Sequence, residues 1–352
     1  MTINLHVLAN PFGITNPRYR MEPFNIAVGK FIRNMQQYDY KIVHYGHESS
    51  AVDCEHVTVV KNSELNPPDD AGLLCEQRPE YISLFGERAS KHIAKIKQPK
   101  DMVLCFYGNS HIPAVKDHRD LTIVEPSIGY LLECVFAPFR AFTSYSQMHY
   151  FYGYHKQMLN PSWYDTVIPN AFSPEEFEFC ETKDDYFVYL GRLQPDKGID
   201  LCIQTTEKLG KKLVLAGPGN LQSLGYKTVP KHVEPIGYVN PEQRRDILKR
   251  AQCLMAPTHY LEPFGNIVVE ALFCGTPVIT TDWGGFTDTV LHGVNGFRAR
   301  DFKSFLHAAE HIHTINPLDC YNSAVTRYTD EIVHKQFDGW LQKLSIRDFY
   351  HV

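Results

Sequence analysis

Residues 186–219 read YFVYLGRLQPDKGIDLCIQTTEKLGKKLVLAGPG, and this stretch decides the fold class. A short apolar run from Tyr186 to Leu190 ends in a glycine turn, a helical stretch starts near Asp200, and a second apolar run covers Lys212 to Ala216. Short apolar runs that alternate with helical segments are typical of a parallel sheet with helices on both faces. The stretch therefore predicts an α/β unit of the doubly wound kind.

The same alternation extends in both directions along the chain. Toward the C-terminus we expect strands near Glu234 to Ile236, Cys253 to Ala256 and Pro277 to Thr281, with helices at Pro241 to Arg250 and Val268 to Phe273. Toward the N-terminus we expect strands at Ile3 to Ala9, Tyr40 to Tyr45, Val57 to Val60, Met102 to Tyr107 and Leu121 to Val124, with helices at Pro23 to Met35 and Glu80 to Lys97. Two doubly wound α/β units follow, with a boundary near residue 170.

The composition narrows the class of protein. The 352 residues are 43% hydrophobic and 21% charged, with a formal net charge of -5 at pH 7. These values exclude a disordered chain and a globally basic nucleic-acid coat. The 9 cysteines form no C-x-x-C pair, no apolar run approaches the ~20 residues of a membrane span, and the first residues lack the positive segment of a secretory signal. We therefore expect a reduced, soluble, cytoplasmic protein.

Two cations flank the turn after the strand at Tyr186 to Leu190. Gly191-Arg192 and Lys197-Gly198 place them beside the start of a helix, and a helix N-terminus with nearby cations favours a diphosphate. The alternative is a turn that carries two solvated cations.

Residues 262–270, EPFGNIVVE, carry the sharpest signal for a binding site. One carboxylate, Glu262, lies in a loop, and the other, Glu270, lies a turn into the following helix, so both can face one edge of the sheet. Carboxylates accept hydrogen bonds from sugar and ribose hydroxyls. A favourable helix dipole explains either glutamate singly, but not the Phe264-Gly265-Asn266 between them.

Taken in order, these segments resemble the retaining GT-B glycosyltransferases of the large family-four type. The match also includes Val167-Ile168-Pro169-Asn170, Ala216-Gly217-Pro218-Gly219, Gly284-Gly285 and residues 293–297, GVNGF. The resemblance implies a GT-B fold, with two Rossmann-like doubly wound domains that face each other across a cleft. Residues 1–170 would bind the acceptor, residues 171–336 would bind the nucleotide sugar, and a helix in 337–352 would pack back on the N-terminal domain.

The resemblance implies that a sugar moves from a nucleotide diphosphate sugar, first of all a UDP-sugar, to a hydroxyl acceptor, with retained configuration. The acceptor would be a saccharide or a glycolipid. No cofactor and no metal would be needed, because cations and helix N-termini can neutralise the leaving diphosphate. Arg192 and Lys197 would hold the diphosphate, Glu270 the ribose, and Glu262, as a catalytic residue, the donor sugar. The remaining donor-binding predictions are Gly13, Gly217, Phe264, Gly265, Asn266 and Ile267.

The resemblance also implies a sugar-facing catalytic residue in the N-terminal half. His111 and Glu125 are the candidates, and Glu125 ranks first because it lies at a strand end before a glycine turn. A charge at a strand terminus without a ligand is the alternative for Glu125.

Other acceptors and other activities stay open at this stage. Basic candidates for contact with an acceptor or a membrane surface are Arg18, Arg20, Arg88, Lys91 and Lys95. With the aromatic stretch at 129–156 they are also compatible with hydroxymethylated DNA, the acceptor of phage base-modifying transferases, although the acidic total counts against a duplex binder. A GT-B epimerase, a phosphorylase and a nucleotide-sugar-binding protein without turnover are further alternatives.

Overall fold

The computed structural model describes residues 2–19, 22–65 and 77–346. These residues divide into two compact units. The N-terminal unit contains the described parts of Met1–Thr143, Phe151–Ile168 and His334–Val352, and the C-terminal unit contains Ser144–Tyr150 and Pro169–Val333. The chain thus enters the second unit for residues 144–150 and again from residue 169, and it returns to the first unit at residue 334, within its last helix.

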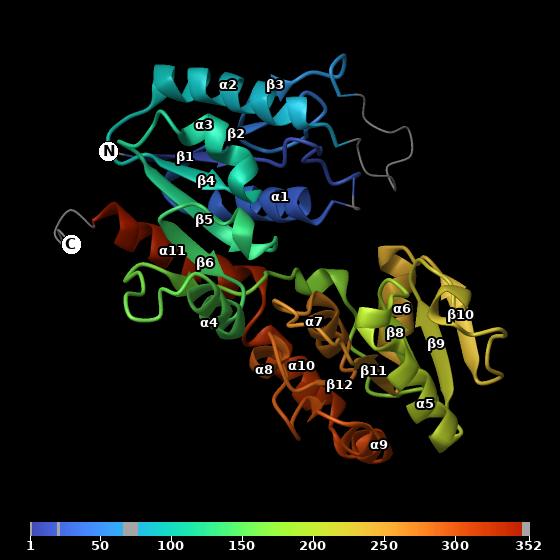
Figure 1. Cartoon of the computed structure of the whole chain (residues 1–352). Coiled ribbons are helices and arrows are strands. Elements are labelled where there is room, and N and C mark those ends of the chain that lie inside the picture. The colour runs from blue at the N-terminus through green and yellow to red at the C-terminus, as the bar shows by residue number, and fades with distance from the viewer. Residues whose placement is uncertain (1, 20–21, 66–76, 347–352) are drawn as a thin grey trace. The chain divides into compact units, whose positions relative to one another are not determined.

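The N-terminal unit is built on a parallel sheet of seven strands in the order β3-β2-β1-β4-β5-β6-β7. Its strands are β1 (Ile3–Leu8), β2 (Tyr40–His47), β3 (Glu55–Val60), β4 (Met102–Cys105), β5 (Thr122–Ile128), β6 (Phe139–Phe142) and β7 (Thr166–Val167). Its helices are α1 (Pro23–Met35), α2 (Pro79–Ile96), α3 (Ile112–Val115), the end of α4 (Tyr145–Tyr154) and most of α11 (Asp330–Ser345). Figure 1 shows α2 and α3 on one face of this sheet and α1 and α11 on the other.

The last helix, α11, is held against the N-terminal unit by specific contacts. The Phe337 ring packs edge-on against Phe31 of α1, with centroids 5.5 Å apart. The indole Nε1 of Trp340 donates to the carbonyl oxygen of Tyr164 at 2.7 Å, and the Tyr40 hydroxyl donates to Asp338 at 2.8 Å. The helix begins at Asp330, before the predicted segment 337–352, and residues 347–352 of that segment lie outside the described residues.

The C-terminal unit is built on a parallel sheet of six strands in the order β10-β9-β8-β11-β12-β13. Its strands are β8 (Tyr186–Leu190), β9 (Lys212–Ala216), β10 (Val233–Gly237), β11 (Cys253–Ala256), β12 (Val278–Thr281) and β13 (Gly296–Ala299). Helix α5 (Ile199–Leu209) packs with α9 (Phe302–His311), while α6 (Pro241–Arg250) and α10 (Pro317–Val325) pack with α7 (Asn266–Phe273). The short helix α8 covers Phe286–Thr289.

Both sheets have the strand order of a doubly wound Rossmann-like fold, so the predicted fold class is confirmed. In such sheets the carboxyl ends of all parallel strands lie along one edge, and ligands bind at that edge. The loops that follow β8, β9, β11 and β12 therefore meet at one edge of the C-terminal sheet.

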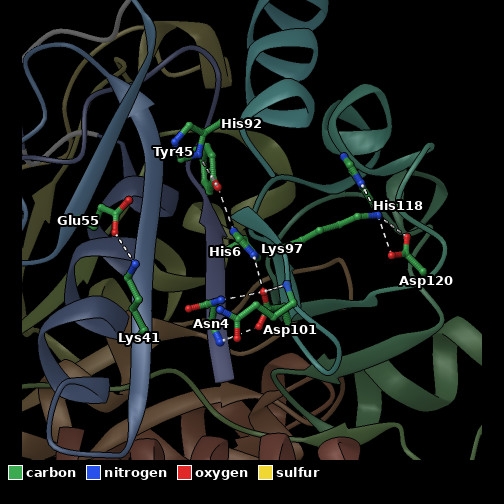
Figure 2. Close-up of polar contacts among 11 residues, drawn as sticks. Asn4, His6, Lys41, Tyr45, Glu55, His92, Lys97, Asp101, His118 and Asp120 are labelled. Atoms are coloured by element: carbon green, nitrogen blue, oxygen red, sulfur yellow. Dashed lines mark hydrogen bonds and ion pairs between the residues drawn. The ribbon is translucent and has the colours of Figure 1, made fainter. Parts of the chain in front are cut away.

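A buried polar network crosses the N-terminal sheet and accounts for several of the 17 histidines. His6 lies between the Tyr45 hydroxyl, 2.9 Å from Nδ1, and the Asp101 carboxylate, 3.3 Å from Nε2 (Figure 2). The same carboxylate accepts hydrogen bonds from the backbone and the side chain of Asn4, and His92 of α2 contacts the Tyr45 hydroxyl at 3.2 Å. Asn4 and Asp101 lie at the amino ends of β1 and β4, away from the edge where ligands bind.

Candidate functional site

Three side chains meet at the carboxyl edge of the C-terminal sheet. The Lys197 ammonium lies 3.2 Å from the Glu262 carboxylate, and the side chains of both are about one fifth exposed. The Tyr260 hydroxyl accepts a hydrogen bond from Lys197 and donates one to Glu262 at 2.8 Å. Burial, and then the neighbouring carboxylate, raise the pKa of Tyr260, so its hydroxyl keeps the proton that it donates to Glu262. Lys197 and Glu262, which the sequence analysis predicted separately, thus lie together. We call Lys197, Tyr260 and Glu262 the Lys197 cluster.

The sequence analysis did not predict Tyr260 as a site residue. Its signal in the sequence is weak, namely a spacing of two residues from Glu262 in a loop, which puts both side chains on one side if that segment is extended. The Lys197 ammonium also lies 4.6 Å from the centre of the Tyr260 ring, at cation–π distance.

The backbone that carries Lys197 depends on glycines where two loops approach closely. Gly198 has φ +70°, and a Cβ there would lie 2.1 Å from the carbonyl oxygen of Pro257. Gly217 has φ +141°, and a Cβ there would lie 1.9 Å from the carbonyl oxygen of Gly191. The predicted donor residue Gly217 therefore has a packing role at the ends of β8 and β9, and it is buried.

Arg192 is exposed in the turn after β8. Its carbonyl oxygen accepts a hydrogen bond from the Tyr189 hydroxyl at 2.7 Å, which fixes the turn. Within the described part of the chain, no carboxylate lies within ion-pair distance of its guanidinium. Its charge is thus available to an anion, whereas that of Lys197 is shared with Glu262.

The loop that carries Glu262 rests on the turn after β12. A Cβ on Gly284 would lie 2.7 Å from the backbone nitrogen of Glu262, and a Cβ on Gly285 would lie 2.5 Å from the carbonyl oxygen of Pro263. The Gly285 N–H donates to the Glu262 carbonyl oxygen at 2.6 Å. The Trp283 indole donates to the carbonyl oxygens of Thr258 and Tyr260 at 3.1 and 3.2 Å. The Gly-Gly pair therefore lets two loops touch backbone to backbone.

The remaining donor residues lie around the N-terminus of α7. Gly265 is the residue before the helix, has φ +86° and has no side chain to cap it, so the first N–H groups of α7 stay available beside Asn266 and Ile267. The Asn266 side chain accepts a hydrogen bond from Asn170 at 2.7 Å. Phe264 is buried and stacks on Phe172, so only its backbone can contact a ligand.

Glu270 lies one turn into α7 and is nearly buried, at 8% exposure. Its carboxylate oxygen lies 3.1 Å from the Arg244 guanidinium of α6. Arg244 was not among the predicted site residues. The only hint in the sequence was that the helix after β10 begins at the same sheet edge. Glu262 and Glu270 each have a cationic neighbour, so neither charge is left uncompensated.

The two catalytic candidates of the N-terminal unit are fully buried. Both Glu125 oxygens are occupied: the Tyr130 hydroxyl donates at 2.6 Å, and the backbone N–H groups of Phe136 and Ala137 donate at 3.1 and 2.9 Å. Burial is the main cause that raises the pKa of Glu125, to about 7. These contacts give Glu125 a structural role, and they do not support its expected contact with a sugar.

His111 ends a short 3-10 helix (Gly108–His111) between β4 and α3, where its Nε2 donates to the Ala9 carbonyl oxygen at 2.9 Å and its ring stacks on Phe85. Burial lowers the pKa of His111 to about 4, so the ring is neutral. Gly13, the predicted phosphate-contacting glycine, is also buried, and a Cβ there would meet the Asn25 side chain at 2.0 Å. Glu125, His111 and Gly13 are thus all buried within the N-terminal unit, and their predicted roles at the donor stay predictions.

The basic candidates do not form one free basic face. The two terminal guanidinium nitrogens of Arg88, Nη1 and Nη2, each donate to Glu64 at 2.7 Å, so this charge is compensated. Lys91, Lys95 and Arg18 are exposed, and Arg20 lies outside the described residues.

The segment that forms this site matches a known protein family. Residues 175–315 match the model of glycosyl transferases group 1. This segment is a group 1 glycosyltransferase domain. It contains the Lys197 cluster, Arg192, Glu270 and the start of α7.

Individual relatives agree with the group 1 domain. The chain is 31% identical over 154 residues to the uncharacterized glycosyltransferase MJ1607 of Methanocaldococcus jannaschii, a match that covers 37% of this chain and 39% of that protein. It is 33% identical over 208 residues to the phosphatidylinositol N-acetylglucosaminyltransferase gpi3 subunit of Schizosaccharomyces pombe, covering 53% of this chain and 42% of that protein. The match thus spans about two fifths of the length of these curated relatives.

The similarity in fold covers nearly the whole chain. A crystal structure of Anabaena Alr3699/HepE in complex with UDP-glucose superposes with a TM-score of 0.66 and 14% identity, over 97% of this chain and 100% of that one. At this identity the likeness shows the fold, which is GT-B. Among the described residues, no helix combines the length and the apolar character that a membrane span needs.

Proposed function

We propose that this chain is a retaining glycosyltransferase that moves a sugar from a UDP-sugar to a hydroxyl of a saccharide or glycolipid. The observation that carries the proposal is the Lys197 cluster, which lies inside the group 1 domain and beside the open N-terminus of α7. A lysine, an available arginine and helix N–H groups together suit a diphosphate, and two carboxylates suit sugar and ribose hydroxyls.

In this proposal Arg192 and Lys197 hold the diphosphate, Glu270 accepts from the ribose, and Glu262 accepts from the donor sugar. The UDP donor is supported by the solved structure of similar fold that contains UDP-glucose. The glycolipid acceptor is supported by the name of the gpi3 relative, whose acceptor is phosphatidylinositol. The N-terminal unit would bind that acceptor.

The reaction breaks the bond between the anomeric carbon and the diphosphate oxygen. The acceptor hydroxyl forms the new bond on the same face of the sugar, its proton passes to an oxygen of the leaving phosphate, and UDP is released. Cations and backbone N–H groups at the diphosphate stabilise the charge that develops there. This chemistry proceeds without a metal, so transfer should survive excess EDTA. Complete loss with EDTA that Mn²⁺ or Mg²⁺ restores would contradict the metal-free mechanism.

Mass spectrometry of the chain incubated with single UDP-sugars and pools of saccharide and glycolipid acceptors tests the proposal. The expected result is an acceptor heavier by one glycosyl residue, with an anomeric configuration like that of the donor. Conversion of the donor alone would indicate an epimerase, and a requirement for inorganic phosphate would indicate a phosphorylase. The DNA acceptor gains no support, because Arg88 of the proposed basic face is paired with Glu64.

A further inference from the structure

We propose that the last turn of α9 is a binding site for a divalent transition-metal ion of the zinc type. Among the described residues, one group of side chains brings three potential metal ligands together, and it consists of His307, Glu310 and His311. Their ligand atoms all lie within 4.8 Å of one another. No residue of the candidate donor site belongs to this group.

The helix itself creates the arrangement. Residues three and four positions apart lie on one face of an α-helix, so His307, Glu310 and His311 project from the same side. The opposite side of α9 carries Phe305, Ala308 and Ala309, which are buried in the core of the unit. The metal-binding face is therefore exposed, while the buried face fixes the helix in place.

A backbone contact fixes which ring nitrogen of His311 carries a hydrogen. Nδ1 of His311 lies 2.8 Å from the carbonyl oxygen of His307. A carbonyl oxygen only accepts, so Nδ1 must donate, and in the neutral ring the lone pair then lies on Nε2, the nitrogen that can bind a metal. Histidines that ligate metals commonly have their second nitrogen held in this way.

The turn that holds the ligands is braced at its end. The Thr314 hydroxyl donates to the carbonyl oxygen of His311 at 2.8 Å, and Nδ1 of His313 lies 3.0 Å from that of Glu310. The rings of His307 and His311 already lie close, with centroids 4.1 Å apart. The three side chains are exposed, so core packing does not restrict their rotation toward a shared ion.

The ligand set indicates the class of ion. Two imidazoles and one carboxylate suit Zn²⁺, Cu²⁺ or Ni²⁺, with water in the remaining position, whereas Mg²⁺ and Ca²⁺ prefer oxygen ligands alone. Bound metal would join the last turn of α9 into one chelate and stabilise the folded C-terminal unit by mass action. The site is separate from glycosyl transfer, which we propose to be metal-free.

Titration of the metal-free full chain with ZnCl₂ by calorimetry, paired with thermal unfolding, tests the proposal. We expect His307→Gln and His311→Gln each to abolish one equivalent of Zn²⁺ binding or weaken it at least about tenfold. We expect saturating Zn²⁺ to raise the Tm of the parent chain by about 2 °C or more, and MgCl₂ to leave it unchanged. His149→Gln, which removes an exposed histidine of α4, is the matched control and should behave like the parent chain.

All three substitutions lie on the surface, so the variants should fold like the parent chain. Unchanged Zn²⁺ binding in both His307→Gln and His311→Gln would overturn the proposal. So would a stoichiometry of one ion per two chains with a dimer on size exclusion, because the ligands would then come from two copies.

Discussion

Lys197 and Glu262 compensate each other's charge at the carboxyl edge of the C-terminal sheet. Their separation of 3.2 Å and partial burial make them an ion pair that a bound diphosphate would reorganise, because Lys197 would then turn toward the phosphates. Glu262 would be left to the sugar hydroxyls. Glu270 has a different environment, since it is nearly buried and faces Arg244.

This difference predicts distinct effects of removing each charge. Glu270→Gln keeps the shape but loses the charge, and we expect it to weaken binding of free UDP. Glu262→Gln should leave UDP affinity nearly unchanged and mainly lower turnover. Calorimetry with UDP and steady-state rates with the UDP-sugar measure the two effects. Greater damage to UDP binding by Glu262→Gln would reverse the assigned roles.

Glu125 lies inside β5 and not at a strand end as the sequence predicted, and its hydrogen bonds go to Tyr130, Phe136 and Ala137 of the same unit. We expect Glu125→Ala to destabilise the chain by about 2–6 kcal/mol, because the backbone N–H groups of Phe136 and Ala137 lose their acceptor at about 1–3 kcal/mol each. Glu125→Gln should fold well, since its amide oxygen can accept both N–H bonds while its nitrogen donates to the Tyr130 hydroxyl. Chemical denaturation and transfer rates check this, and a folded but inactive Glu125→Gln would restore the catalytic role.

At the scale of elements, the turn after β12 and the loop before α7 are in direct backbone contact, so a change in one should displace the other. Gly285 has an ordinary helical backbone, with φ −61°, so its lack of a side chain matters only for space. We expect Gly285→Ala to cost about 1–3 kcal/mol by overpacking and to lower donor affinity, because the loop that carries Glu262 must shift. Gly339→Ala in α11, where a Cβ meets nothing within 4 Å, is the control and should be neutral or stabilising. Equal stability of the two variants would show that this backbone contact is not needed.

The sequence predicted the buried elements best. The ranges expected for β8, β9, β11, α1 and α6 agree with the structure residue for residue, because continuous apolar runs and clear helix starts mark them. The short strands β6 and β7 were missed, since four and two residues carry too little pattern. The resemblance to group 1 glycosyltransferases was confirmed, but neither the link through Tyr260 nor the burial of Glu125 could be read from spacing, because both depend on distant segments.

At the scale of the whole molecule, buried neutral histidines make stability depend on pH. Burial lowers the pKa of His111 to about 4 and lowers the pKa of His44 further. Burial also lowers the pKa of His6, with partial compensation from Asp101. A histidine whose pKa is lowered on folding takes up a proton on unfolding, so its contribution to stability is lost as pH falls below the unfolded value near 6.5.

Buried carboxyls oppose this effect in part. Glu125 has a pKa of about 7 in the folded chain, so it is protonated there at pH 6. Its contribution to the free energy of unfolding is therefore lost as the pH rises from 4.5 to 7. Among the described residues of the N-terminal unit, more histidines have a lowered pKa than carboxyls have a raised one. The histidines are His6, His44, His47, His56 and His111, and the carboxyls are Glu22, Glu125 and Asp165.

The net prediction is a loss of stability between pH 7 and pH 5. Urea unfolding of the full chain at intervals of half a pH unit measures this loss. His111→Gln should reduce the slope of the unfolding free energy against pH by up to about 1.4 kcal/mol per pH unit. Constant or rising stability toward pH 5 would show that the histidines are not held neutral.

The central claim is that the group 1 domain binds a nucleotide diphosphate through Arg192 and Lys197. Calorimetric titration of UDP into the chain with EDTA present tests it most directly, with Arg192→Ala and Lys197→Ala compared with Lys303→Ala as a control on α9. We predict binding without metal, a loss of about 1.5–3 kcal/mol in each of the first two variants, and an unchanged affinity in the control. UDP affinity that is the same in all four proteins would contradict the account.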